Sequence, residues 1–210
     1  MVRIKICGIT NLEDALLAAE LGAQALGFIF YPKSPRSIKP DAARDIIKSL
    51  PPLVLSVGVF VDEEAEVVRD VAARVGLDWV QLHGKESPEY CRVLGRRVIK
   101  GFRIRDHNSL TALPSYRDAV QAFLLDAYRP GTPGGTGETF DWEVARRAKE
   151  LGPVILAGGL TAANVAQAIK IAQAAGVDVA SGVEAAPGKK DPEKLRAFFK
   201  AVREVVISDQ

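Results

Sequence analysis

The sequence predicts an α/β protein with one domain, a closed (β/α)8 TIM barrel of eight parallel strands and their helices. Short β-branched runs alternate with amphipathic stretches about eight times along the 210 residues. Eight such units average about 26 residues each, near the minimum for a closed barrel. No linker or low-complexity segment interrupts the alternation. We therefore expect residues 1–210 to form a single (β/α)8-barrel catalytic domain.

An open doubly wound sheet is the competing architecture, and six or seven strands would suit it equally well. Such a sheet normally carries a Gly-x-Gly-x-x-Gly motif after its first strand when it binds a nucleotide. Nothing resembling that motif follows residues 2–6. The closed barrel is therefore the better interpretation.

The expected strands are short runs rich in β-branched and aliphatic residues, each bounded by turn-forming or polar residues. The third is the longest, and the seventh and eighth are the shortest. They cover residues 2–6, 25–30, 54–60, 79–82, 98–102, 122–125, 154–156 and 177–179.

The expected helices are the amphipathic stretches that follow these strands. The first begins near Asn11, because Asn11 precedes Asp14 at the spacing of a capping pair. The fifth is the weakest, since it is short and the polar residues 103–108 before it resemble a loop. The helices are expected from 11 to about 21 and at 40–50, 62–74, 87–94, 108–113, 141–150, 161–174 and 191–206.

The composition is that of an ordinary globular protein, with a net charge of +2 and both signs mixed along the chain. We therefore expect no nucleic-acid partner and no polybasic membrane anchor. No apolar run approaches the roughly 18–20 residues of a membrane span, and the first residues lack the regions of a signal peptide. Two cysteines and two histidines predict a cytoplasmic protein without a disulfide framework or a zinc site.

Polar residues gather where the expected strands end, which in a barrel is the active face. Cys7 ends the first strand, and Lys5 lies on the same strand face two positions earlier. A lone cysteine is often only a small buried apolar residue. If both side chains point into the barrel mouth, however, the ammonium would lower the thiol pKa and favour a thiolate able to act as a base. Cys91 has no such setting and is interpreted as structural.

Two carboxylates lie at or near the ends of later strands. Asp126 follows an aliphatic run without other charges, where burying an unpaired carboxylate is costly, and it is the candidate general acid. Its alternative is a helix cap or a loop hydrogen bond. Asp178 also faces inward in the pattern, and a ligand contact and a role in holding neighbouring loops are equally consistent with it.

Glycine turns after the seventh and eighth strands predict a phosphate site. Gly158-Gly159 leads into a helix, and Ser181-Gly182 follows the last strand. Barrels commonly hold a phosphate with these two loops. The glycine-rich residues 134–137 lack the ending of a P-loop and are interpreted as a mobile loop that covers the substrate. Arg36 is a candidate for carboxylate recognition, although an exposed loop arginine is the simpler interpretation.

The chain resembles the phosphoribosylanthranilate isomerase family of tryptophan biosynthesis. The resemblance covers residues 5 to 191 in the expected order, and together the segments are highly specific. Ala180 departs from it, because many relatives have a second serine there. The matching segments are 5–10 (KICGIT), 27–30 (GFIF), 34–36 (SPR), 57–60 (VGVF), 81–84 (QLHG), 124–126 (LLD), 134–137 (GGTG), 156–160 (LAGGL), 181–184 (SGVE) and 187–191 (PGKKD).

The resemblance implies a cofactor-free rearrangement of N-(5-phosphoribosyl)anthranilate into the corresponding 1-deoxyribulose 5-phosphate. It implies that Asp126 is the general acid, Cys7 the general base and Arg36 the ligand of the anthranilate carboxylate. It implies that the two glycine turns bind the phosphate. His83 matches a motif, either as a substrate contact or as a structural hydrogen bond. The partner is then a small phosphorylated molecule, and the protein is a monomer or a homodimer.

The residues at the strand ends leave three other functions open. Indole-3-glycerol-phosphate synthase shares the barrel and phosphate loops, but it requires a lysine acid and a glutamate base. The aminoaldose isomerase of histidine biosynthesis uses two aspartates, whereas the first-strand position here is Cys7. A non-catalytic phosphosugar-binding barrel would keep Arg36 and the glycine turns without needing Cys7.

Overall fold

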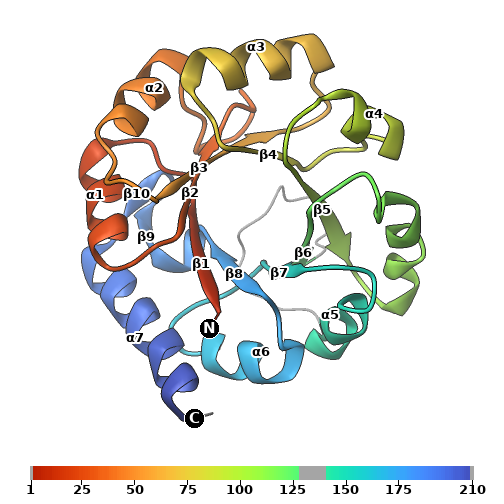
Figure 1. The fold of residues 1–210 in the computed structure, drawn as a ribbon. Coiled ribbons are helices and arrows are strands. Elements are labelled where there is room, and N and C mark those ends of the chain that lie inside the picture. Colours follow the sequence, from red (N-terminus) through yellow and green to blue (C-terminus); the bar gives the residue numbers. More distant parts are fainter. Residues whose placement is uncertain (1, 128–140, 209–210) are drawn as a thin grey trace.

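The computed structural model describes residues 2–127 and 141–208. Eight parallel strands form a closed barrel in sequence order, and the first strand pairs with the eighth (Figure 1). The predicted barrel is therefore confirmed, and the open sheet is excluded. The strands are β1 (Arg3–Cys7), β2 (Ala25–Ile29), β3 (Leu55–Phe60), β4 (Trp79–Leu82), β5 (Val98–Ile104), β6 (Ala122–Ala127), β7 (Val154–Leu156) and β8 (Gly176–Val179).

Helices surround the barrel on its outside (Figure 1). The first begins as predicted, because the Asn11 side chain accepts a hydrogen bond of 2.8 Å from the backbone N–H of Asp14. The α-helices of the described residues are α1 (Leu12–Glu20), α2 (Pro40–Lys48), α3 (Ala65–Val75), α4 (Pro88–Val93), α5 (Trp142–Ala148), α6 (Val165–Ala172) and α7 (Pro192–Ser208).

The fifth unit differs most from its prediction. Two short 3-10 helices, η1 (His107–Leu110) and η2 (Leu113–Tyr116), replace the expected α-helix. The side chains of Asp106 and Ser109 form a capping box that starts η1. Pro114 lacks a backbone N–H and restricts the residue before it, so one continuous α-helix does not form here.

Two helices begin three or four residues later than predicted. Asp62 has a φ of 51°, which is incompatible with a right-handed helix, and α3 therefore starts only at Ala65. The Asn164 side chain accepts a hydrogen bond of 2.8 Å from Thr161 N–H, and this turn delays α6. A short hairpin of β9 (Glu184–Ala186) and β10 (Lys189–Lys190), which the sequence pattern did not predict, precedes α7.

The hydrophobic residues form two clusters. The larger one lies between strands and helices and contains residues such as Ile6, Phe28 and Phe198. The smaller one comes from alternate strand positions and strand ends and fills the barrel interior; it consists of Val57, Ile99, Ala122, Leu124 and Ala157. The strands are thus packed on both sides, which fixes the direction of the side chains at their carboxyl ends.

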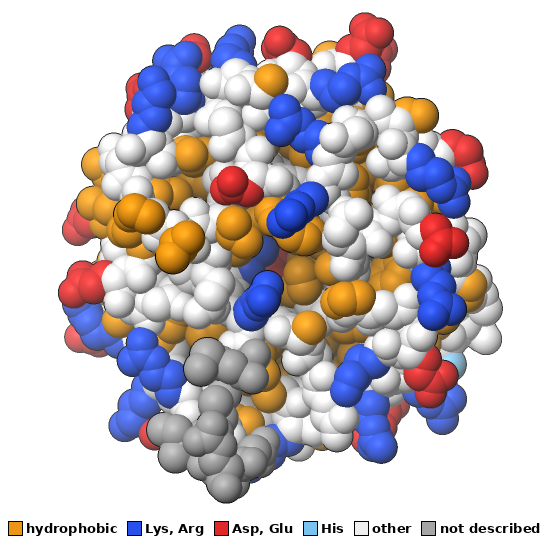
Figure 2. All heavy atoms as spheres, in the orientation of Figure 1, with side chains coloured by type: hydrophobic (Ala, Val, Ile, Leu, Met, Phe, Trp, Pro, Cys, Tyr) orange, Lys and Arg blue, Asp and Glu red, His pale blue; other side chains and the backbone are white. Residues whose placement is uncertain are grey.

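The charged side chains are distributed as the net charge of +2 suggests. On the face shown in Figure 2, acidic and basic side chains are interspersed around the rim, without a large area of one sign. Among the described residues, no helix combines the length and the apolar character that crossing a membrane requires.

Candidate active site

All nine site residues predicted from the sequence line one cavity at the carboxyl end of the strands. The cavity also contains residues that the prediction did not include, among them Gln81 and Arg103. These nine residues lie in six separate segments of the chain, and the closed barrel brings the segments together. They are Cys7, Arg36, His83, Asp126, Gly158, Gly159, Asp178, Ser181 and Gly182.

Cys7 lies beside a buried ion pair. The ammonium of Lys5, which shares its strand face, lies 2.8 Å from Oδ1 of Asp178 on β8. Gly27 on β2 faces both side chains, and a Cβ atom there would lie 2.8 Å from Cys7 Sγ and 2.9 Å from Lys5 Nζ. Glycine at this position therefore leaves the room that the thiol and the ammonium share.

The prediction for the thiol pKa was wrong in sign. Burial raises the pKa of Cys7 above its ordinary value, and Asp178 raises it further, although the charge of Lys5 acts to lower it. Burial is the largest of these effects, so the pKa rises although an ammonium lies beside the thiol. The pKa of Lys5 is itself raised: burial lowers it, but the neighbouring Asp178 and Cys7 outweigh that effect.

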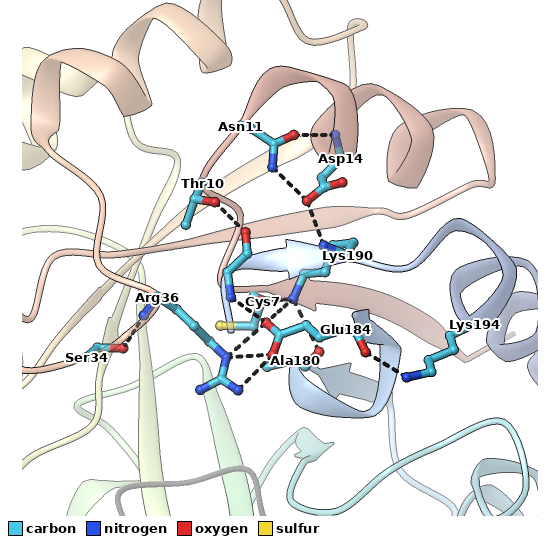
Figure 3. A network of polar contacts seen from close by, with 11 residues as sticks. Cys7, Thr10, Asn11, Asp14, Ser34, Arg36, Ala180, Glu184, Lys190 and Lys194 are labelled. Carbon is cyan, nitrogen blue, oxygen red and sulfur yellow. Dashed lines mark hydrogen bonds and ion pairs between the residues drawn. The ribbon is translucent and has the colours of Figure 1, made fainter. Parts of the chain in front are cut away.

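Arg36 is held by the carboxylate of Glu184, which the sequence does not predict as part of the site. Its Nε donates to both oxygens of Glu184 at 2.9 and 3.0 Å, and its Nη2 donates to Oε2 at 2.7 Å (Figure 3). Arg36 is therefore not an exposed loop arginine. The backbone N–H of Arg36 also donates to Ser34 Oγ at 3.2 Å, which orders the loop after β2.

The buried ammonium of Lys190 completes this network from the other side. Its Nζ donates to Glu184 Oε1 at 2.9 Å, to the Cys7 carbonyl at 2.6 Å and to the Ala180 carbonyl at 3.2 Å (Figure 3). Glu184 and Lys190 stand inside matching segments of the sequence, but isolated charges there are usually solvent-exposed. No signal in the linear pattern separates them from exposed residues such as Lys189.

Asp126 is the next-to-last residue of β6 and contacts His83. His83 Nε2 lies 3.4 Å from Asp126 Oδ2, and His83 Nδ1 lies 3.2 Å from Nε2 of Gln81 on β4. If the Gln81 amide donates, the His83 proton is on Nε2 and points to Asp126.

A Cβ on Gly158 would collide with Ala127 N, and Gly158 has a φ of 84°, so the turn after β7 requires glycine at this position.

The two glycine turns pack against each other. A Cβ on Gly182 would collide with the Leu160 carbonyl, so only glycine permits this approach. The Asn164 side chain donates to the Gly159 carbonyl at 2.9 Å and fixes the first turn. In the described part of the chain, the N–H groups of Gly159 and Gly182 meet no acceptor. Such N–H groups can bind an anion.

Two further expectations fall elsewhere. The predicted covering loop at residues 134–137 lies outside the described residues. Cys91 is buried in α4, as its structural interpretation expects, and burial raises its pKa to about 11. Within residues 2–127 and 141–208, no three potential ligands gather as a metal site. That a cofactor is unnecessary remains a prediction.

The closed barrel and its polar mouth define the protein as a (β/α)8-barrel enzyme. The family model described as N-(5'phosphoribosyl)anthranilate (PRA) isomerase matches residues 4–201. A relative of that name from Geobacter sp. (strain M21) is 56% identical over 98% of this chain and 100% of its own length. The chain belongs to the N-(5'-phosphoribosyl)anthranilate isomerase family and is an isomerase of tryptophan biosynthesis.

Solved structures agree with this family. The phosphoribosyl anthranilate isomerase of Thermotoga maritima has a TM-score of 0.92 and 46% identity, covering 97% of this chain and 100% of its own. A second isomerase structure, in complex with reduced 1-(o-carboxyphenylamino)-1-deoxyribulose 5-phosphate, has a TM-score of 0.88 and 44% identity, with the same two coverages. The resemblance seen in the sequence is thus confirmed, and the three alternative functions are set aside.

Proposed function

We propose that this chain converts N-(5-phosphoribosyl)anthranilate into 1-(2-carboxyphenylamino)-1-deoxyribulose 5-phosphate with Asp126 as general acid and Cys7 as general base. The observation that carries the proposal is that the two side chains line one cavity from β6 and β1, which are not neighbouring strands. The proposal is further supported by the related isomerase bound to a reduced form of this product.

In the first step, protonated Asp126 transfers its proton to the ring oxygen of the ribose. The bond between that oxygen and C1 breaks, and the electron pair of the amine nitrogen forms the double bond of an iminium ion. His83, 3.4 Å from Oδ2, orients the carboxyl group and is a hydrogen-bond partner for the carboxylate left behind. This is the structural one of the two roles open for His83.

In the second step, Cys7 removes the proton from C2. The electrons of the C–H bond form a C1–C2 double bond, the iminium nitrogen becomes neutral, and the resulting enolamine tautomerises to the ketone. Burial raises the pKa of the thiol in the free protein. Before it can act as the base, the Cys7 thiol therefore releases its own proton to solvent. The cationic iminium beside it, with Lys5 as a second positive charge, stabilises the thiolate that remains. Asp178 holds Lys5 in place and borders the substrate.

The two charged ends of the substrate bind at separate places in the cavity. Arg36 pairs with the anthranilate carboxylate, and the N–H groups of the Gly158-Gly159 and Ser181-Gly182 turns bind the phosphate. Ala180 contributes only its backbone to this region, so the absent serine hydroxyl has a modest effect. The reaction needs no cofactor in this scheme, because each step is a proton transfer. We also propose a cytoplasmic monomer or homodimer.

A fluorescence assay tests the proposed function. The purified chain is expected to remove the fluorescence of phosphoribosylanthranilate in a first-order decay and to form the aminoketose. The control substrate is the phosphorylated aminoaldose of histidine biosynthesis, on which little turnover is expected. Binding of phosphoribosylanthranilate without any turnover would instead indicate a non-catalytic phosphosugar-binding barrel.

A further inference from the structure

We infer that Lys190 is a positioning residue that ties the base Cys7 and the carboxylate-binding Arg36 into one unit. The inference deepens the proposed function and rests on the roles proposed there for these two residues. Lys190 lies on β10, within the hairpin that the sequence pattern did not predict, far along the chain from both.

The side chain of Lys190 is fully enclosed and fixed at both ends. Its exposed fraction is 0%. Its backbone N–H donates to Asp14 Oδ2 at 2.8 Å, and Asn11 Nδ2 donates to the same oxygen at 2.7 Å (Figure 3). The start of α1 therefore anchors the strand from which the ammonium extends.

The ammonium has no hydrogen left for a substrate. A lysine has three N–H donors, and Lys190 contacts three oxygens: the carbonyls of Cys7 and Ala180 and the carboxylate of Glu184. The Cys7 carbonyl lies at the end of β1 and the Ala180 carbonyl just after β8. Lys190 thus spans the seam where the barrel closes, and it acts through other residues rather than on the substrate.

Glu184 transmits this arrangement to Arg36. It occupies the edge of the guanidinium formed by Nε and Nη2, which leaves the edge formed by Nη1 and the second Nη2 hydrogen. Among the described residues, Nη1 has no hydrogen-bond acceptor, and Arg36 borders the cavity. The free edge is the planar pair of donors that binds a carboxylate with two hydrogen bonds.

The charge of Lys190 also reaches the thiol. It acts to lower the pKa of Cys7, together with Lys5 and against the effects of burial and Asp178. Burial lowers the pKa of Lys190 itself, while Glu184 acts in the opposite direction. The charges that act on the thiol are those of Lys5 on β1, Asp178 on β8 and Lys190 on β10. Glu184 on β9 pairs with Lys190 and with Arg36 after β2. His83, Arg103 and Asp126 line the same cavity as Cys7.

Three substitutions distinguish a role of Lys190 in positioning Cys7 and Arg36 from a purely structural role. Lys190→Met is expected to raise KM and to lower kcat, so that kcat/KM falls about 10- to 100-fold, because both substrate-binding and base geometry change. Glu184→Gln is expected to raise KM with a smaller change in kcat. Lys189→Met, an exposed neighbour on the same short strand, is the matched control and should behave like the wild type.

Alkylation of the thiol gives a readout that does not depend on turnover. In a Cys91→Ala background, the rate of reaction with iodoacetamide against pH reports the pKa of Cys7. Lys190→Met is expected to shift this pKa upward by roughly one unit, and Lys189→Met to leave it in place. Should Lys190→Met not fold, Lys190→Arg preserves the charge and is expected to lose about 10-fold in kcat/KM, because a guanidinium presents its donors in a different geometry.

The inference is overturned if folded Lys190→Met matches Lys189→Met in KM, kcat and thiol pKa, or if Lys190→Arg has wild-type kinetics. A change in thermal stability alone, with unchanged kinetics and thiol pKa, would equally overturn it and leave Lys190 as a structural residue. Failure of the proposed function has another signature, since the wild type would then not turn over phosphoribosylanthranilate. The alkylation measurement would still decide whether Lys190 acts on Cys7.

Discussion

The two sides of the cavity are held in different ways. On the side of Cys7, buried ions make short contacts, such as 2.8 Å between Lys5 and Asp178 and 2.7 Å between Arg36 and Glu184. On the side of Asp126, the only ion-pair partner within the described residues is His83, at 3.4 Å. The base is thus built into a charged framework, whereas the acid has a single, longer contact.

The difference follows from what each group must do. A carboxyl group that pairs closely with lysine or arginine is stabilised as the anion and is a poor proton donor near neutral pH. A neutral histidine N–H orients a carboxyl group without that penalty. A thiol, by contrast, becomes a base only where positive charges favour its anion, and the side of Cys7 supplies Lys5 and Lys190.

Removing the two reacting groups is the strongest test of this comparison. Asp126→Asn and Cys7→Ser should each lower kcat by about 10²- to 10⁴-fold, because general acid–base groups contribute that much. Both variants should fold and bind substrate, which circular dichroism and ligand titration can measure. Cys91→Ser is the control and should keep wild-type turnover. An active Cys7→Ser together with an inactive Cys91→Ser would show that the base is misassigned.

Removing Arg36, which is proposed to bind the anthranilate carboxylate, should have the next largest effect. Arg36→Met is expected to raise KM through the loss of about 1.5–3 kcal/mol of binding free energy, the range for a hydrogen bond to a charged group. The change in kcat should be smaller, since the anthranilate carboxylate is distant from the reacting carbons. Steady-state kinetics measure both, with the exposed Arg117→Met as control. An unchanged KM would show that Arg36 does not bind the substrate.

Removing the hydrogen bonds that orient Asp126 should lower activity less than these changes. His83→Asn removes the contact with Asp126, and Gln81→Leu removes the partner of the imidazole. Each should lower kcat by up to about 10-fold, because a hydrogen bond contributes about 0.5–1.5 kcal/mol. KM should change little. A loss as large as that of Asp126→Asn would mean that His83 takes part in proton transfer itself.

Acid should weaken the charged side through Glu184. Burial alone would raise its pKa, but Arg36 and Lys190 hold the pKa of Glu184 below its ordinary value. This group therefore stabilises the folded protein fully above its ordinary pKa, and the contribution is lost as the pH falls through the lower pKa of the folded state. Urea unfolding between pH 2 and 7 should show a smaller pH dependence for Glu184→Gln than for the wild type. Equal slopes would contradict the assignment.

Chelation of metal ions should not change the activity. The described residues offer no cluster of potential metal ligands, and each proposed step is a proton transfer. Dialysis against EDTA should leave kcat and KM unchanged. Loss of activity that zinc or magnesium restores would contradict the mechanism, because a metal would then share the work of Asp126 or Cys7.

Most of the fold could be predicted from local sequence patterns. The predictions that were wrong also concerned short segments of the chain. The Asn11–Asp14 cap was read correctly because both partners lie in one turn of the chain. The helix expected at 108–113 was wrong because the proline at 114 outweighs a short apolar pattern. The start of α3 was misplaced because the backbone of Asp62 adopts a positive φ that no pattern of hydrophobicity reveals.

The sequence by itself determined the order of the βα units and the chemical groups at the strand ends, because strand and helix periodicity are short-range properties. It therefore identified Cys7, Asp126 and the glycine turns as candidates. The tertiary structure alone decided that Arg36 meets Glu184, that Lys190 spans the barrel seam, and that burial raises the pKa of Cys7. These outcomes depend on desolvation and on contacts between residues more than 140 positions apart, such as the 148 that separate Arg36 from Glu184.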